Sequence, residues 1–128
     1  MTLTPAGLTP SDAVFSGQLR LVGYAEEPLL EGGVRVTLVW QRLAPIPTAY
    51  NVFVHLLDAD GQHAVSADHK PGYGTVDLRT WADARVLVDT YDLTQPLAHP
   101  AAVEVGVYDP ISGQRLAPSV LRLPYTAS

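Results

Sequence analysis

Apolar and polar residues alternate along most of this chain, and short turn-forming segments separate the alternating stretches. The clearest example covers residues 34–41, in which Val34, Val36, Leu38 and Trp40 fall on one face. A period of two residues is typical of a β-strand with one face buried. The pattern predicts a strand at 34–41 and places Trp40 in the core.

A β-hairpin is predicted over residues 50–68. The stretches 50–57 and 62–68 flank Asp60-Gly61, and Asp-Gly between two apolar runs is a strong signal for a tight hairpin turn. If Val54 and Leu56 lie opposite Val65 and Ala67, His55 shares a face with Ser66 and Asp68.

Further strands are predicted at 18–24, 85–93, 102–108, 114–116 and 120–123, with a turn at 109–113. No segment keeps a helical period. The fold class is therefore all-β, an antiparallel two-sheet sandwich of the immunoglobulin-like kind with seven or eight strands, and a jelly roll is the alternative. The predicted core consists of Val36, Leu38, Trp40, Val52, Val54, Leu56, Val86, Val88, Val103, Val105 and Val107.

One domain is expected. The chain has 128 residues, of which 47% are apolar, so its length fits a single domain and its composition argues against disorder. Residues 1–13 contain Pro5 and Pro10 and little that could pack, which predicts an N-terminal arm or linker. Residues 14–128 form the predicted β-sandwich domain.

Charge and composition exclude several functions. The chain has 8 basic and 13 acidic residues and a formal net charge of −5, which argues against nucleic acid as a partner. It has no cysteine, which rules out disulfides, thiol nucleophiles and thiolate metal sites. No apolar run approaches the ~18 residues of a membrane span, so no direct membrane insertion of this segment is expected.

His55 is the main candidate for chemistry, because a histidine near Asp58 and Asp68 could act as a general base. The alternative is a structural histidine that holds a neighbouring strand by hydrogen bonds. No serine lies in a nucleophile-elbow setting, so we expect no enzyme activity.

No metal or other cofactor is expected either. Asp58–Gly61 begins like a calcium loop, but the twelfth position is His69 where such a loop needs Glu. His63 and His69 would lie roughly 20 Å apart along a strand. With His55 and His99, they are interpreted as surface histidines.

Two further groups could bind a ligand. Asp89 and Tyr91 project to one side of their strand, where Asp89 could make a structural ion pair or hydrogen bonds, or line a groove. Trp81, Tyr73 and Tyr91 could form an aromatic platform for a sugar ring. Alternatively, Trp81 closes the open end of the sandwich.

Several motifs occur in an order that is typical of one known domain: Leu21-Val-Gly-Tyr24, Val36–Gln41, Phe53–Gly61, Thr80-Trp81, Val88–Tyr91 and Gly106–Pro110. The chain thereby resembles, over about residues 17–117, the C-terminal soluble β-sandwich domain of bacterial membrane proteins. Those proteins, of the Chloroflexi type, are similar to glycosyltransferases of the mannosyltransferase type. The resemblance implies an extracytoplasmic accessory domain and supplies no catalytic residues.

We therefore expect a non-catalytic accessory domain whose partner is a glycan or a neighbouring protein domain, bound weakly. The alternative is a stand-alone interaction module, such as a sandwich-type protease inhibitor with an exposed rigid loop at 43–48 or 71–80.

Overall fold

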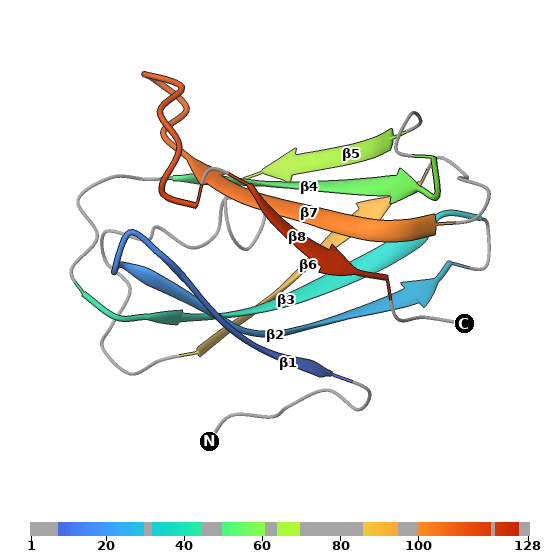
Figure 1. Cartoon of the computed structure of the whole chain (residues 1–128), viewed down its shortest axis with the longest axis horizontal. Helices are drawn as coiled ribbons and strands as arrows, with labels where there is room; N and C mark the ends of the chain where they lie inside the picture. Colours follow the sequence, from blue (N-terminus) through green and yellow to red (C-terminus); the bar gives the residue numbers. More distant parts are fainter. Residues whose placement is uncertain are drawn as a thin grey trace.

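The chain folds as an all-β sandwich of two four-stranded antiparallel sheets (Figure 1). The computed structural model describes residues 8–29, 32–44, 50–60, 64–69, 86–94, 100–118 and 120–125. The eight strands within them are β1 (Thr9–Phe15), β2 (Leu19–Pro28), β3 (Val34–Arg42), β4 (Asn51–Asp58), β5 (Ala64–His69), β6 (Val86–Leu93), β7 (Pro100–Tyr108) and β8 (Leu121–Pro124).

The strand order is that of an immunoglobulin-like sandwich. One sheet has the order β1-β2-β3-β6 and the other the order β5-β4-β7-β8. Strands β2, β3 and β6 occupy the places of immunoglobulin strands A, B and E, while β4, β7 and β8 occupy those of C, F and G. Strand β5 pairs with β4, and β1 adds an edge strand beside β2.

Strand β1 lies partly within residues 1–13, which we expected to be an arm. Its pairing with β2 shifts register between Pro10 and Ala13, and Phe15 at its end is buried in the core. Proline is tolerated on an edge strand because its missing N–H can face away from the sheet. Pro10 therefore interrupts the ladder without preventing the strand.

The interior follows the predicted alternation in β3, β4 and β7. Phe15 packs edge-on against Trp40, with ring centroids 5.6 Å apart. Burying such side chains supplies most of the favourable free energy of folding, at roughly 25 cal/mol per Å² of apolar surface. Nine predicted core residues are buried: Val36, Leu38, Trp40, Val52, Val54, Leu56, Val103, Val105 and Val107.

Strand β6 turns the opposite face to the core, so the prediction for Val88 is wrong. Val88 pairs with Val39 on the outer face and is 43% exposed. The next residue of β6, Asp89, faces inward; it pairs with Leu38 and is buried. Because the inward face of β6 carries the acidic residue Asp89, the outward face with Val86 and Val88 looked like the apolar one in the sequence. The side chain of Val86 lies outside the described residues.

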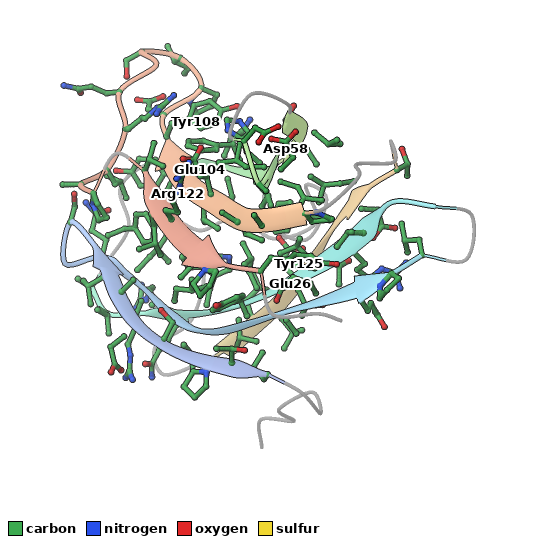
Figure 2. The ribbon with its side chains drawn as sticks, turned by 45° about the vertical axis from the view of Figure 1, so that its right-hand side comes forward. Glu26, Asp58, Glu104, Tyr108, Arg122 and Tyr125 are labelled. Carbon is green, nitrogen blue, oxygen red and sulfur yellow. The ribbon has the colours of Figure 1, made fainter. Side chains whose placement is uncertain are left out.

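A bulge in β2 lets Tyr24 contact the other sheet. The register with β3 shifts between Leu21 and Gly23, and Tyr24 therefore turns into the core. The Tyr24 hydroxyl donates a hydrogen bond of 3.0 Å to the carbonyl oxygen of Pro124 at the end of β8. Burial, and to a smaller extent Glu26, raises the pKa of Tyr24. Figure 2 shows Glu26 and Tyr125 at this junction.

Among the residues that the structure describes, there is no helix with the length and hydropathy needed to cross a membrane.

Candidate functional site

The outer face of the β5-β4-β7-β8 sheet carries the most chemically varied cluster among the described residues. Phe53 and His55 project from β4, and Glu104 and Tyr108 project from β7. Arg115, in the β7–β8 connection, completes what we call the β4–β7 face. Figure 2 shows Glu104 and Tyr108 on the side of this sheet that faces away from the other sheet.

Phe53 forms the floor of the β4–β7 face. It pairs with Gly106 of β7, and a Cβ atom at position 106 would overlap its ring. The ring therefore lies against the bare backbone of β7, and Phe53 is only 6% exposed although it points away from the core. His55 and Tyr108 flank it, with ring centroids 4.7 Å and 6.3 Å from that of Phe53.

Arg115 covers the floor from the loop side. The central carbon of its guanidinium group lies 4.8 Å from the Phe53 ring centroid, within the range of a cation–π contact. A bridge pairs Arg115 with Tyr108, and the Leu116 N–H donates to the Val107 carbonyl. The guanidinium group is thus carried by backbone that is hydrogen-bonded to the sheet.

His55 faces a carboxylate on the neighbouring strand. His55 Nδ1 lies 3.8 Å from Glu104 Oε1, and Arg122 of β8 lies 3.4 Å from Glu104 Oε2. Glu104 therefore lies between a histidine and an arginine. The positive charge of Arg122, joined by that of His55 whenever the imidazole is protonated, offsets the negative charge of the Glu104 carboxylate.

A shallow pocket of about 250 Å³ opens in this face. Its described lining consists of Phe53, His55, Tyr108, Gly113 and Arg115. It is smaller than the roughly 300–1,000 Å³ of pockets that enclose drug-sized ligands. It could take one sugar ring or a small polar group.

A second, larger hollow of about 530 Å³ lies beside the β2–β3 turn. Arg35 Nε and Nη2 donate to the two carboxylate oxygens of Asp92, at 2.7 Å and 3.1 Å. These hydrogen bonds lower the pKa of Asp92. Glu27, 3.9 Å from Arg35, adds a second acid, so this hollow is mainly an ion-pair cluster. Its remaining described lining is Pro28, Leu29, Gly32 and Thr94.

Comparison with known proteins gave no match to a family model, a curated protein or a solved structure.

The structure brings His55 beside Ser66, as the hairpin register predicted. Val54 pairs with Ala67, Leu56 with Val65 and His55 with Ser66. Asp68 takes the β5 position opposite Phe53, and its side chain lies outside the described residues.

Asp89 and Tyr91 lie inside the sandwich. Asp89 is 3% exposed, and the Tyr91 hydroxyl donates to Asp89 Oδ2 at 2.9 Å. The Thr90 N–H donates to Asp89 Oδ1 at 3.1 Å. The two side chains therefore form a buried hydrogen bond, which agrees with the interpretation of Asp89 as a structural residue and not with the alternative that it lines a groove. Because Tyr91 is fully buried, its ring is not available to stack on a surface ligand.

The other two members of the expected aromatic platform, Tyr73 and Trp81, lie outside the described residues. The same holds for His63, His99 and the side chain of His69. Within the part of the chain that the structure describes, no three histidine or acidic side chains gather to hold a metal ion.

Sequence reasoning missed Phe53, Tyr108 and Arg115 as a group. A usable signal was present, because Phe53 and His55 are two residues apart on β4, opposite the apolar positions Val52 and Val54. Gly106 and Tyr108 have the same spacing on β7. What the pattern does not contain is the β4–β7 register, which sets Phe53 against Gly106.

Proposed function

We propose that this chain is a non-catalytic accessory domain that binds a glycan weakly on the β4–β7 face. The observation that carries the proposal is the shallow pocket, in which an aromatic floor, Phe53, is ringed by polar side chains. The Tyr108 hydroxyl and the His55 imidazole are hydrogen-bonding groups that suit sugar hydroxyls, and the Arg115 guanidinium group is a donor. All three are carried by strands or by loop backbone that is paired to a strand.

Weak binding follows from the shape. A shallow site makes few contacts, and these must compensate for lost motion of the ligand and for desolvation of its hydroxyls. The non-catalytic assignment rests on the sequence, which contains no cysteine and no serine in a nucleophile-elbow setting. The resemblance of the sequence to accessory domains of glycosyltransferase-like membrane proteins supports the same role and an extracytoplasmic location.

Chemical-shift mapping of the labelled protein against a panel of bacterial oligosaccharides tests this function. We expect perturbed signals to cluster at Phe53, His55 and Tyr108. Tyr108→Phe should weaken binding by removing the hydroxyl while keeping the ring. Tyr24→Phe is the matched control, because its hydroxyl lies inside the sandwich. Perturbation by no sugar, or clustering elsewhere, would contradict the proposal.

A second candidate is a protein-interaction module of the protease-inhibitor kind, and a different loop favours it. The β7–β8 connection projects beyond the end of the sandwich (Figure 1). Ile111, in the turn between Asp109 and Gln114, is 95% exposed. Asp109 braces the loop: its N–H donates to the Gln114 carbonyl, its carbonyl accepts from the Gly113 N–H, and its carboxylate accepts from the Ile111 N–H. A braced loop loses little freedom when it enters a partner's pocket.

An inhibition assay separates this candidate from glycan binding. If it holds, the protein inhibits an elastase-type serine protease, whose specificity pocket is small and apolar. Ile111→Asp should abolish that inhibition, and Ile111→Val should retain it. The absence of inhibition by the unmodified protein would argue against this candidate.

A further inference from the structure

We infer that Ser16 is a positioning residue of the pocket in the β4–β7 face, because it holds the β7–β8 connection against the turn between β1 and β2. Two hydrogen bonds form this contact. The Ser16 N–H donates to the Ala117 carbonyl at 2.8 Å, and the Ala117 N–H donates to Ser16 Oγ at 3.0 Å. Both segments lie at the same end of the sandwich (Figure 1). The effect on ligand binding rests on the glycan-binding function proposed above.

One wall of the pocket belongs to the β7–β8 connection. Gly113 and Arg115 line the pocket from this connection, whereas Phe53, His55 and Tyr108 line it from β4 and β7. The strand residues are held by the ladder between β4 and β7. The position of the other wall, and with it the shape of the pocket, depends on how the connection is held.

The connection has little burial to hold it. Its described residues after Asp109 are exposed, with the exception of Leu116. Segments with exposed backbone and few buried contacts open locally at a low free energy. The Leu116 N–H donates to the Val107 carbonyl of β7 at 2.9 Å. The contact with Ser16 follows at the next residue and comes from the other sheet, so the backbone beside Arg115 is bonded to both sheets.

The residue type at position 16 supports this role. Ser16 and Gly17 have φ angles of 50° and 69°, and the Gln18 N–H donates to the Phe15 carbonyl across them. A turn with positive φ at both central positions favours asparagine before glycine, and serine is strained there. Such strain persists where surrounding contacts over-determine the conformation. The hydroxyl that accepts the Ala117 N–H gives serine a function in this turn that glycine lacks.

Ser16→Gly tests the inference, because glycine tolerates the positive φ and lacks only the hydroxyl. The turn should still form, with little change in the urea midpoint. We expect the Leu116 N–H to exchange with solvent about two- to tenfold faster, as the loss of one hydrogen bond allows. The Arg115 side-chain signals should lose part of the ring-current shift that Phe53 causes. Affinity for an oligosaccharide that binds the unmodified protein should fall by about twofold or more, because fewer molecules have the wall in place.

Ser11→Gly is the matched control. It removes a hydroxyl that accepts a backbone N–H, that of Ala13 at 3.2 Å, within β1 itself. It should leave the Leu116 exchange rate and the Arg115 signals unchanged. A further measurement needs no variant, since the Ala117 N–H of the unmodified protein should be protected from exchange although the residue is exposed.

The outcomes separate the inference from the function on which it rests. An unprotected Ala117 N–H, or unchanged Leu116 exchange and Arg115 signals in Ser16→Gly, would overturn the inference and leave the glycan-binding function standing. Changed signals with unchanged affinity would also overturn the positioning role, because the pocket would then bind without that wall. No oligosaccharide binding by the unmodified protein would overturn both.

Discussion

Gly106→Ala should destabilise the protein through a single side chain, the ring of Phe53. Gly106 is not among the glycines with positive φ, so its backbone conformation suits alanine, and the obstacle is steric. A Cβ atom there would overlap the ring, which is 6% exposed. Overpacking of this kind costs about 1–3 kcal/mol, and a ring displaced into water forfeits a similar burial free energy. We expect the free energy of unfolding to fall by about 1–3 kcal/mol.

A double-mutant cycle with Phe53→Ala isolates that cause. Without the ring, alanine at position 106 has no clash, and it should stabilise the strand by about 0.5–1 kcal/mol because glycine loses more backbone freedom on folding. Urea denaturation of the four proteins gives the coupling free energy, which we expect to be at least about 1.5 kcal/mol. In thermal melts each kcal/mol corresponds to roughly 3–5 °C. If Gly106→Ala destabilises both backgrounds equally, the ring is not the reason for glycine here.

Three further predictions concern the core and the surface ion pair. Tyr91→Phe removes the hydroxyl that donates to the buried carboxylate of Asp89 and should cost about 1–3 kcal/mol in urea denaturation; an unchanged midpoint would mean that this contact contributes nothing. Val54→Ala should cost about 1–3 kcal/mol, whereas Val88→Ala on the outer face of β6 should stay within about 0.5 kcal/mol; similar losses would contradict the assigned faces. The hydrogen bond from Arg35 lowers the pKa of Asp92, so this ion pair stabilises the fold at pH values above the unfolded pKa of the acid, and that stabilisation is lost as pH falls through the folded pKa. The free energy of unfolding, measured from pH 7 to pH 2, should therefore fall less steeply for Asp92→Asn than for the unmodified protein. The difference should be small because both side chains are partly exposed.

Much of the fold could be predicted because burial on one face imposes a period of two. The strands β3, β4 and β7 carry that period, and their inward valines and leucines are buried, although outward-facing Val39 and Phe53 are buried as well. Asp60-Gly61 is a strong local signal for a turn in the sequence, so the pairing of β4 with β5 was also predictable. The prediction of an all-β two-sheet sandwich is confirmed.

Where the sequence misled, the structure depends on contacts that the alternation of apolar and polar residues does not encode. Asp89 is tolerated on the core face because the Tyr91 hydroxyl and the Thr90 N–H donate hydrogen bonds to its carboxylate. An acidic residue at an inward position makes the inward face of β6 look like the polar, solvent-facing one in the sequence. Residues 9–13 were assigned to the N-terminal arm because Pro10 weakens a strand, but they belong to β1, which pairs with β2. The candidate site depends on β4 meeting β7 about 50 residues later in the chain, which no local signal encodes.

Strand β1 also has a bearing on how copies of this protein behave toward one another. An open sheet edge is a template for another strand, and proteins blunt such edges with proline, charge and bulges. Here β1 places Pro10, the highly exposed Asp12 and a register shift at the outer margin of its sheet. It covers β2, a longer strand of ten residues. A chain trimmed at its amino end to begin after Phe15 would present the longer edge of β2 to solvent and invite edge-to-edge aggregation, so the irregular first strand acts as a guard against self-association.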